Sequence, residues 1–140
     1  MLKKTIEYTD YDGNKRKEDF YFNLTKAELT EMNFSTKGGF EKWIMRIINA
    51  QDSKEIIGVF KDIILKSYGE KSLDGRRFVK NDELRESFSQ TEAYSQLFME
   101  LATDDEKAAE FINGIIPAEL AEEMAKQESE RKIIQMNSGE

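Results

Sequence analysis

The sequence predicts an α+β fold that is predominantly α-helical, with an N-terminal β-hairpin followed by about six to seven helices in one compact domain. Three patterns support this prediction. Alternating apolar and polar residues flank Asp12-Gly13, apolar residues recur at helical spacing through the middle of the chain, and helix-capping residues precede several of those segments. We expect residues 1–126 to form the globular domain, with the hairpin in 1–24 and helices in 25–126. Residues 127–140 are expected to form a flexible tail.

The hairpin is predicted from its turn and from its alternation. Asp12-Gly13 is a strong two-residue turn signal, and the arms place Ile6 and Tyr8 on one strand and Phe20 and Phe22 on the other. An isolated two-stranded ribbon is only marginally stable in water. We therefore expect this ribbon to lie on helices or to join a larger sheet.

The acidic turn of this hairpin also has the beginning of a calcium-binding loop. The run from Asp10 to Asn14 supplies oxygen ligands, but the sixth position of such a loop is Lys15 instead of glycine. The twelfth position is Tyr21, where a bidentate glutamate is required. We interpret the segment as a turn and expect no metal.

The first helices are predicted from a cap and two apolar stripes. Thr25 and Glu28 form a capping box for a short helix, "KAELTEMNF". Helices are expected at 40–50 and 53–68, forming the centre of the core, with Gly69 as the glycine that ends the second. Their apolar positions are Phe40, Trp43, Ile44, Ile47 and Ile48, and then Ile56, Ile57, Phe60, Ile63, Ile64 and Tyr68.

Four later helices are predicted from further caps. Asn81 or Asp82 is expected to cap "ELRESF", and Pro117 to begin the last helix. Between them we predict helices at 91–102 and 104–113, packed on the central pair. The signals are two capping boxes, Ser89 with Glu92 and Thr103 with Glu106, and an Asn113-Gly114 stop.

The composition argues against an enzyme. The chain has no cysteine and no histidine, which removes the thiolate nucleophile and the commonest general base and metal ligand. Acidic pairs such as Asp104-Asp105 are more often found in a first helical turn, where they complement the helix dipole. Gly38-Gly39 lacks the surrounding residues of a phosphate-binding loop. We expect no catalytic residue, no cofactor and no metal site.

The charge is unevenly distributed. Residues 1–81 hold 16 Lys and Arg against 13 Asp and Glu, whereas residues 82–130 hold 3 against 14. Scattered lysines do not form the dense basic face that nucleic acid requires, and no segment is long and apolar enough to span a membrane or serve as a signal peptide. The asymmetry has two interpretations: a solvated acidic surface, or complementarity between copies or with a basic partner.

The connector "KSYGEKSLDGRRFVKND", residues 66–82, is unusually long for a plain link between helices. Asp74-Gly75 indicates a turn, and the residues after it could form a short extended piece. One interpretation has Phe78 closing the core while Arg76 or Arg77 pairs with acids of the later helices. The other makes the connector a docking edge, because arginine and aromatic residues are enriched at interface hot spots.

Residues 66–117 resemble the tail assembly chaperones of long-tailed bacteriophages. The similar features, in order, are Tyr68-Gly69, the run Asp74-Gly75-Arg76-Arg77-Phe78, the helix "EAYSQLFMELATD" and the close "AAEFINGIIP". The resemblance implies a non-enzymatic protein that binds the tape measure protein, keeps it soluble and helps to recruit tail tube subunits. Such a protein acts in the host bacterial cytoplasm and is absent from the mature virion. We expect partner contacts at Tyr68, Arg76, Arg77 and Phe78.

Other classes of protein fit the same composition. A structural tail or head-completion subunit has no need of a reactive centre either, and would be found in purified virions. An acidic inhibitor or DNA mimic would show regularly spaced acids on one face. A hydrolytic enzyme would need converging carboxylates in a cleft. We also expect that copies of the chain associate with one another, in keeping with the uneven charge.

Overall fold

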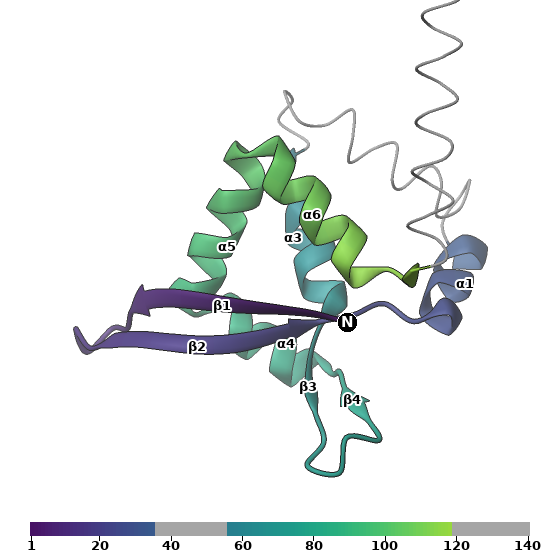
Figure 1. Cartoon of the computed structure of the whole chain (residues 1–140), viewed down its shortest axis with the longest axis horizontal. Helices are drawn as coiled ribbons and strands as arrows, with labels where there is room; N and C mark the ends of the chain where they lie inside the picture. Colours follow the sequence, from purple (N-terminus) through teal and green to yellow (C-terminus); the bar gives the residue numbers. More distant parts are fainter. Residues whose placement is uncertain (36–55, 119–140) are drawn as a thin grey trace, which may run out of the picture.

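The computed structural model describes residues 1–35 and 56–118, which form a mixed sheet-and-helix body (Figure 1). The described residues contain five helices, fewer than the six to seven predicted for the whole chain. Three predictions fall outside the described residues: the helix at 40–50 with Trp43, the last helix beyond residue 118, and the tail. The single-domain boundary at 126 therefore stays a prediction. The elements are β1 (Leu2–Thr9), β2 (Lys15–Phe22), α1 (Lys26–Ser35), α3 (Ile56–Ser67), β3 (Tyr68–Lys71), β4 (Phe78–Val79), α4 (Asp82–Ser89), α5 (Glu92–Thr103) and α6 (Asp105–Ile115).

The N-terminal hairpin is confirmed, but the predicted two-residue loop at Asp12-Gly13 is wrong. The Asp10 N–H donates to Asn14 O and the Gly13 N–H donates to Asp10 O, so the loop has three residues, 11–13. β1 and β2 pair antiparallel from Leu2 opposite Phe22 to Thr9 opposite Lys15. Gly13 adopts a φ of 85°, which only glycine adopts readily, and the Asp10 carboxylate accepts hydrogen bonds from the backbone N–H groups of Asp12 and Asn14. Asp10 also binds Arg16 at 2.6 Å. The acidic run is therefore a turn, as its sequence predicts.

A second hairpin, which the sequence did not predict, extends the sheet. The segment after α3 forms β3 and β4, giving a four-stranded sheet in the order β1-β2-β3-β4. β3 joins the end of β2 by pairing Tyr21 with Gly69 and Phe22 with Tyr68. The prediction that Gly69 ends α3 as a left-handed glycine is wrong, because only Gly13 and Gly75 have positive φ among the described residues. α3 passes directly into a strand, since Ser67 O accepts the N–H of Asn23 at 2.8 Å.

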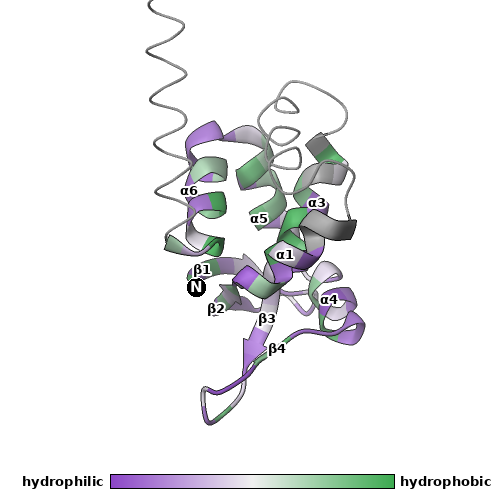
Figure 2. Cartoon of the chain, turned by 90° about the vertical axis from the view of Figure 1, so that its right-hand side faces the viewer, coloured by the Kyte–Doolittle hydropathy of each residue, from purple (hydrophilic) through white to green (hydrophobic). Residues whose placement is uncertain are grey.

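The core lies between the sheet and helices α3, α5 and α6. In Figure 2 the hydrophobic residues of these helices gather where the helices face one another and the sheet, while the β3–β4 hairpin projects from the body and is largely hydrophilic. Phe22 is fully buried at the centre, and its ring lies 5.2 Å from Phe111, 5.8 Å from Tyr68 and 5.9 Å from Phe88. The predicted core positions Phe60, Ile63 and Ile64 are confirmed. Ile57, predicted on the same apolar stripe, is 61 % exposed, because it lies on the face of α3 that is turned away from this core.

The helix caps are confirmed in part. Thr25 and Glu28 form the predicted box, with Thr25 Oγ1 accepting the N–H of Glu28 and Glu28 Oε1 accepting the N–H of Thr25. Asn81 caps α4 by accepting the N–H of Leu84 at 2.8 Å. In each cap the two residues that form the hydrogen bond are three positions apart in the sequence, and for this reason the caps were predictable.

Two other capping predictions are wrong. Ser89 belongs to the last turn of α4, where its hydroxyl donates to Glu86 O, and Thr91 caps α5. Thr103 ends α5, and Asp104 caps α6 by accepting the N–H of Lys107. These caps lie one or two residues beyond the predicted ones, because burial of one face decides where each helix begins.

The predicted stop at Asn113-Gly114 is also wrong. α6 runs on to Ile115, which is fully buried. Gly114 lies against the Leu2 side chain, where an added Cβ would come within 2.8 Å. This glycine serves close packing of α6 on β1 instead of ending the helix.

Candidate functional site

The β3–β4 hairpin is the candidate functional site, because it projects from the body and carries most of the predicted partner residues (Figure 1). Its tip is a closed network of short-range hydrogen bonds. The Ser72 N–H donates to Arg77 O at 2.8 Å, and the Gly75 N–H donates to Ser72 O at 2.9 Å. Gly75 has a φ of 74°, as a turn of this kind requires. The predicted Asp74-Gly75 turn and the extended piece after it are therefore confirmed.

Side chains reinforce this turn. The Ser72 hydroxyl donates to Asp74 Oδ1 at 2.6 Å, and the same carboxylate oxygen accepts the N–H of Arg76 at 3.1 Å. These two hydrogen bonds, that of Ser72 first, lower the pKa of Asp74. The Arg77 N–H donates to Ser72 Oγ at 3.0 Å. The backbone that carries both arginines is thus held in one conformation without help from the rest of the fold.

The base of the hairpin is packed tightly. A Cβ added at Gly69 would lie 2.8 Å from both the Phe78 ring and Val79 O, so only glycine allows β4 to approach β3 this closely. The Lys71 ammonium lies 4.2 Å from the centre of the Tyr21 ring, a cation–π contact across the strands. Strand pairing and these contacts connect the hairpin to β2.

A half-buried ion pair anchors the end of β4 to α1. Lys80 Nζ lies 2.5 Å from Glu28 Oε2 and 2.6 Å from Asn23 O. Burial lowers the pKa of Lys80 and Glu28 only partly restores it. Burial also opposes ionisation of Glu28, but the hydrogen bonds from Lys80 and Thr25 outweigh it, so the pKa of Glu28 falls below 4.5. Lys80 is the more deeply buried partner, with 10 % of its side chain exposed against 33 % for Glu28, so its loss of hydration offsets much of the attraction. The net stabilisation is therefore modest, about 1 kcal/mol.

We expect Glu28→Gln to lower the free energy of unfolding by about 1 kcal/mol at pH 7. The pKa of Glu28 is lower in the folded protein than in the unfolded chain, so its stabilising effect is present above the unfolded pKa and is lost as pH falls through the folded pKa. The difference between wild type and Glu28→Gln should then shrink below about pH 4.5 in urea titrations. Glu110→Gln, an exposed change of equal charge, serves as control. If the free energies of unfolding of the wild type and Glu28→Gln differed by the same amount at pH 3 as at pH 7, the ion pair would contribute nothing to stability.

The predicted site residues have different environments. Arg76 and Arg77 are exposed at the hairpin tip, and within the described residues neither forms an ion pair, so the predicted pairing with acids of later helices does not occur there. Phe78 is half-buried against Gly69. Tyr68 is only 8 % exposed and stacks on Phe88, with ring centres 4.2 Å apart. Burial, followed by the nearby Glu70, raises the pKa of Tyr68 to about 12. Partner binding by these residues stays a prediction.

Leu73 is a surface residue that the sequence interpretation missed. It lies between Ser72 and Asp74 in the turn and is completely exposed, at 110 % of the reference area. Single exposed apolar residues are common on protein surfaces, so Leu73 is a candidate only because it stands among polar residues in a projecting turn. The contrast with its polar neighbours was visible in the sequence and could have identified the residue.

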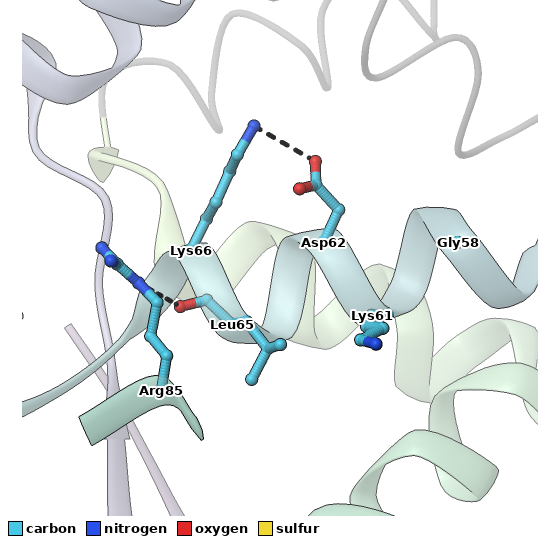
Figure 3. Close-up of a pocket in the computed structure, with 6 residues that line it drawn as sticks. All are labelled: Gly58, Lys61, Asp62, Leu65, Lys66 and Arg85. Carbon is cyan, nitrogen blue, oxygen red and sulfur yellow. Dashed lines mark hydrogen bonds and ion pairs between the residues drawn. The ribbon is translucent and has the colours of Figure 1, made fainter. Parts of the chain in front are cut away.

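Surface pockets are formed by described residues on two parts of the body. One, of about 470 Å³, lies along α3 and is lined by Gly58, Lys61, Asp62, Leu65, Lys66 and Arg85 (Figure 3). Lys66 pairs with Asp62 at 3.2 Å, and Arg85 Nε donates to Leu65 O at 3.1 Å. The other, of about 450 Å³, lies between the β1–β2 hairpin and α5. In residues 1–35 and 56–118, no three metal-ligating side chains come together.

These features define a small α+β protein whose projecting β3–β4 hairpin exposes Leu73, Arg76 and Arg77 on an ordered turn. The chain belongs to the phage tail assembly chaperone family, whose family model matches residues 1–139. The match confirms the resemblance noted for residues 66–117 and extends it over nearly the whole chain, and the family indicates a non-enzymatic assembly role. Neither the curated proteins nor the solved structures include a significant match. None of the helices in the described segments has the length and apolarity needed to cross a bilayer.

Proposed function

We propose that this chaperone binds the tape measure protein of its phage, keeps that protein soluble and assists tail tube assembly by recruiting tube subunits. It acts in the host bacterial cytoplasm, makes and breaks no bond, and is absent from the mature virion. The family membership supports an assembly role, and the β3–β4 hairpin supports the place of contact. The single observation that carries this assignment is the exposure of Leu73, Arg76 and Arg77 on a turn that is held by backbone and side-chain hydrogen bonds of its own residues.

The hairpin fits an extended or helical client segment with acidic and apolar residues. The guanidinium groups of Arg76 and Arg77 are able to bind carboxylates of a client in bidentate geometry, and Leu73 offers an apolar contact beside them. Because the turn is already ordered by Ser72 and Asp74, little conformational entropy is lost when a partner binds. Within residues 1–35 and 56–118 the short strand β4 is the last strand of the sheet, so its outer edge is available there for backbone pairing with an extended client.

Co-expression with the tape measure protein from the same genome tests the proposed function. We expect the tape measure protein to be soluble with this chain and to aggregate without it, as measured by the soluble fraction after centrifugation. A tape measure protein whose solubility does not depend on this chain would contradict the proposal.

The hairpin assignment is tested by charge reversal. Arg76→Glu with Arg77→Glu should leave the melting temperature nearly unchanged, because both side chains are exposed, and should weaken client binding about tenfold or more. Lys15→Glu with Lys107→Glu is a matched control, since it changes the net charge by the same amount at exposed positions outside the β3–β4 hairpin. Affinity is measured by pull-down and titration with tape measure fragments. Equal weakening in both double variants would indicate a general charge effect and remove the hairpin from the site.

Mass spectrometry of purified virions separates the chaperone from the structural-subunit alternative. We expect the chain in infected-cell extracts but not in particles. Recovery in a fixed ratio to tail proteins would favour the structural subunit instead.

A further inference from the structure

The first strand has a long free edge. β1 spans eight residues and is the first strand of the sheet order, so within the described part of the chain only β2 pairs with it. Helices cover its inner face: Lys4 pairs with Glu100 of α5 at 3.0 Å, and Leu2 packs on Gly114 of α6. A long exposed edge is usually shortened, or protected by proline, bulges or charged side chains, because its free N–H and C=O groups attract another strand. The charges on this edge have opposite signs, Lys3 and Glu7, so they exclude some partner strands and not others.

The register shows which backbone groups face outward. At the turn, the Asp10 N–H donates to Asn14 O, which makes Asp10 and Asn14 a hydrogen-bonded pair in line with the strand register. Hydrogen-bonded pairs alternate in an antiparallel ladder, so the even-numbered residues of β1 use their backbone groups toward β2. The backbone N–H and C=O groups that point to the free edge therefore belong to Lys3, Thr5, Glu7 and Thr9.

The side chains of these same residues form a self-complementary row. Lys3, Thr5 and Glu7 are exposed on the outer face, and a base and an acid lie at equal distances on either side of Thr5. Glu7 Oε1 lies 3.7 Å from Lys17 Nζ on the same face of the sheet, whereas Lys3 forms no ion pair with any described residue. A second β1 strand placed antiparallel, with Thr5 opposite Thr5, would bring each Lys3 opposite a Glu7.

We propose that two copies of this chain associate through their β1 edges in this antiparallel register. The hydrogen-bonded pairs across the two-fold axis are Thr5 with Thr5 and Lys3 with Glu7, twice. The two four-stranded sheets then form one continuous eight-stranded sheet. On its inner face, Leu2 lies opposite Tyr8 of the second copy.

Charge complementarity selects both the register and the occupant. A shift of two residues in either direction places Lys3 opposite Thr5 or Thr9 and Glu7 opposite Met1 or Thr5, so both ion pairs are lost. Opposite charges facing each other across strands stabilise a pair, and like charges destabilise it. A copy of the same strand meets this requirement. The proposal uses β1 and leaves the β3–β4 hairpin free, so it does not depend on tape measure binding.

Charge swaps test the register. Sedimentation velocity over micromolar to submillimolar concentrations should show reversible dimers of the wild-type chain. Lys3→Glu alone and Glu7→Lys alone should each raise the dimer dissociation constant about tenfold or more, since each creates two like-charge pairs. The double variant Lys3→Glu with Glu7→Lys should restore dimers. An equimolar mixture of the two single variants should also dimerise, because the acid introduced at position 3 of one variant then faces the base introduced at position 7 of the other.

Cross-linking tests the proposed antiparallel arrangement of the two β1 strands. Because the chain has no native cysteine, an introduced cysteine is the only thiol that reacts. Thr5→Cys should give a covalent dimer with a short bis-maleimide, and Leu73→Cys at the exposed hairpin tip should not. Circular dichroism and thermal melts establish that each variant is folded. A wild-type chain that stays monomeric throughout, single variants that dimerise as wild type does, or a folded Thr5→Cys variant that does not cross-link would overturn the proposal.

Discussion

Phe22→Ala is expected to lower the free energy of unfolding by about 3–5 kcal/mol, a large part of the total stability of a domain of this size. Phe22 is fully buried, and its ring contacts aromatic residues from β3, α4 and α6: Tyr68, Phe88 and Phe111. Removing the ring leaves a cavity at the point where the sheet meets the helices. Urea denaturation followed by circular dichroism measures the loss.

Tyr11→Ala is the matched control for this prediction. It removes another aromatic ring from the same hairpin, but Tyr11 is 75 % exposed and its hydroxyl donates only a long hydrogen bond of 3.2 Å to Gln90 O, beside Glu92. We expect a change below about 1 kcal/mol. If Phe22→Ala were no more damaging than Tyr11→Ala, the described core would be wrong.

Gly69→Ala is expected to destabilise the β3–β4 hairpin by about 1–3 kcal/mol through overpacking. The new Cβ would lie 2.8 Å from the Phe78 ring and from Val79 O, and the backbone oxygen can move away only if β4 shifts as a whole. Because Gly69 also pairs with Tyr21, the change loosens the attachment of the hairpin to β2. Client affinity should fall along with stability.

Gly58→Ala provides the opposite result from the same chemical change. Gly58 lies in α3, and an added Cβ there meets nothing within 4 Å. Alanine is a better helix former than glycine, so this variant should be stabilised by up to about 1 kcal/mol. Hydrogen exchange of the β3 and β4 amides distinguishes the two glycine variants. We expect these amides to exchange faster than in the wild type in Gly69→Ala, and at the wild-type rate in Gly58→Ala. Protected hairpin amides in a folded Gly69→Ala variant would contradict the close approach.

Local signals were sufficient for several features. Several features depend on residues within a few positions of one another: the place of the first turn, though not its length, the Thr25–Glu28 box, the Asn81 cap and the stripe through Phe60, Ile63 and Ile64. Such interactions form wherever the backbone adopts the helix or turn, so their spacing alone predicts them. The Asp74-Gly75 turn and the extended piece at Phe78 belong to the same group.

Longer-range choices could not be predicted in this way. Nothing next to Gly69 in the sequence indicates that it pairs with Tyr21, and a glycine after an apolar helix is more often a helix stop. The caps at Thr91 and Asp104 were misplaced for a similar reason, since burial of Ala93, Leu97 and Ala108 fixes where α5 and α6 begin. Tyr68 was predicted as an apolar position at the end of a helix and is indeed buried, but it lies in β3 between Phe22 and Phe88, residues distant from it in sequence.

The sequence by itself determined the class of the protein: an α+β chain without thiol or imidazole, carrying a segment similar to tail assembly chaperones. Only the tertiary structure decided that residues 68–79 extend the sheet, and that Leu73, Arg76 and Arg77 lie on an ordered turn. The physical reason is that turns and caps are set by neighbours in sequence. Strand pairing and burial are set by residues that meet only after the chain has folded.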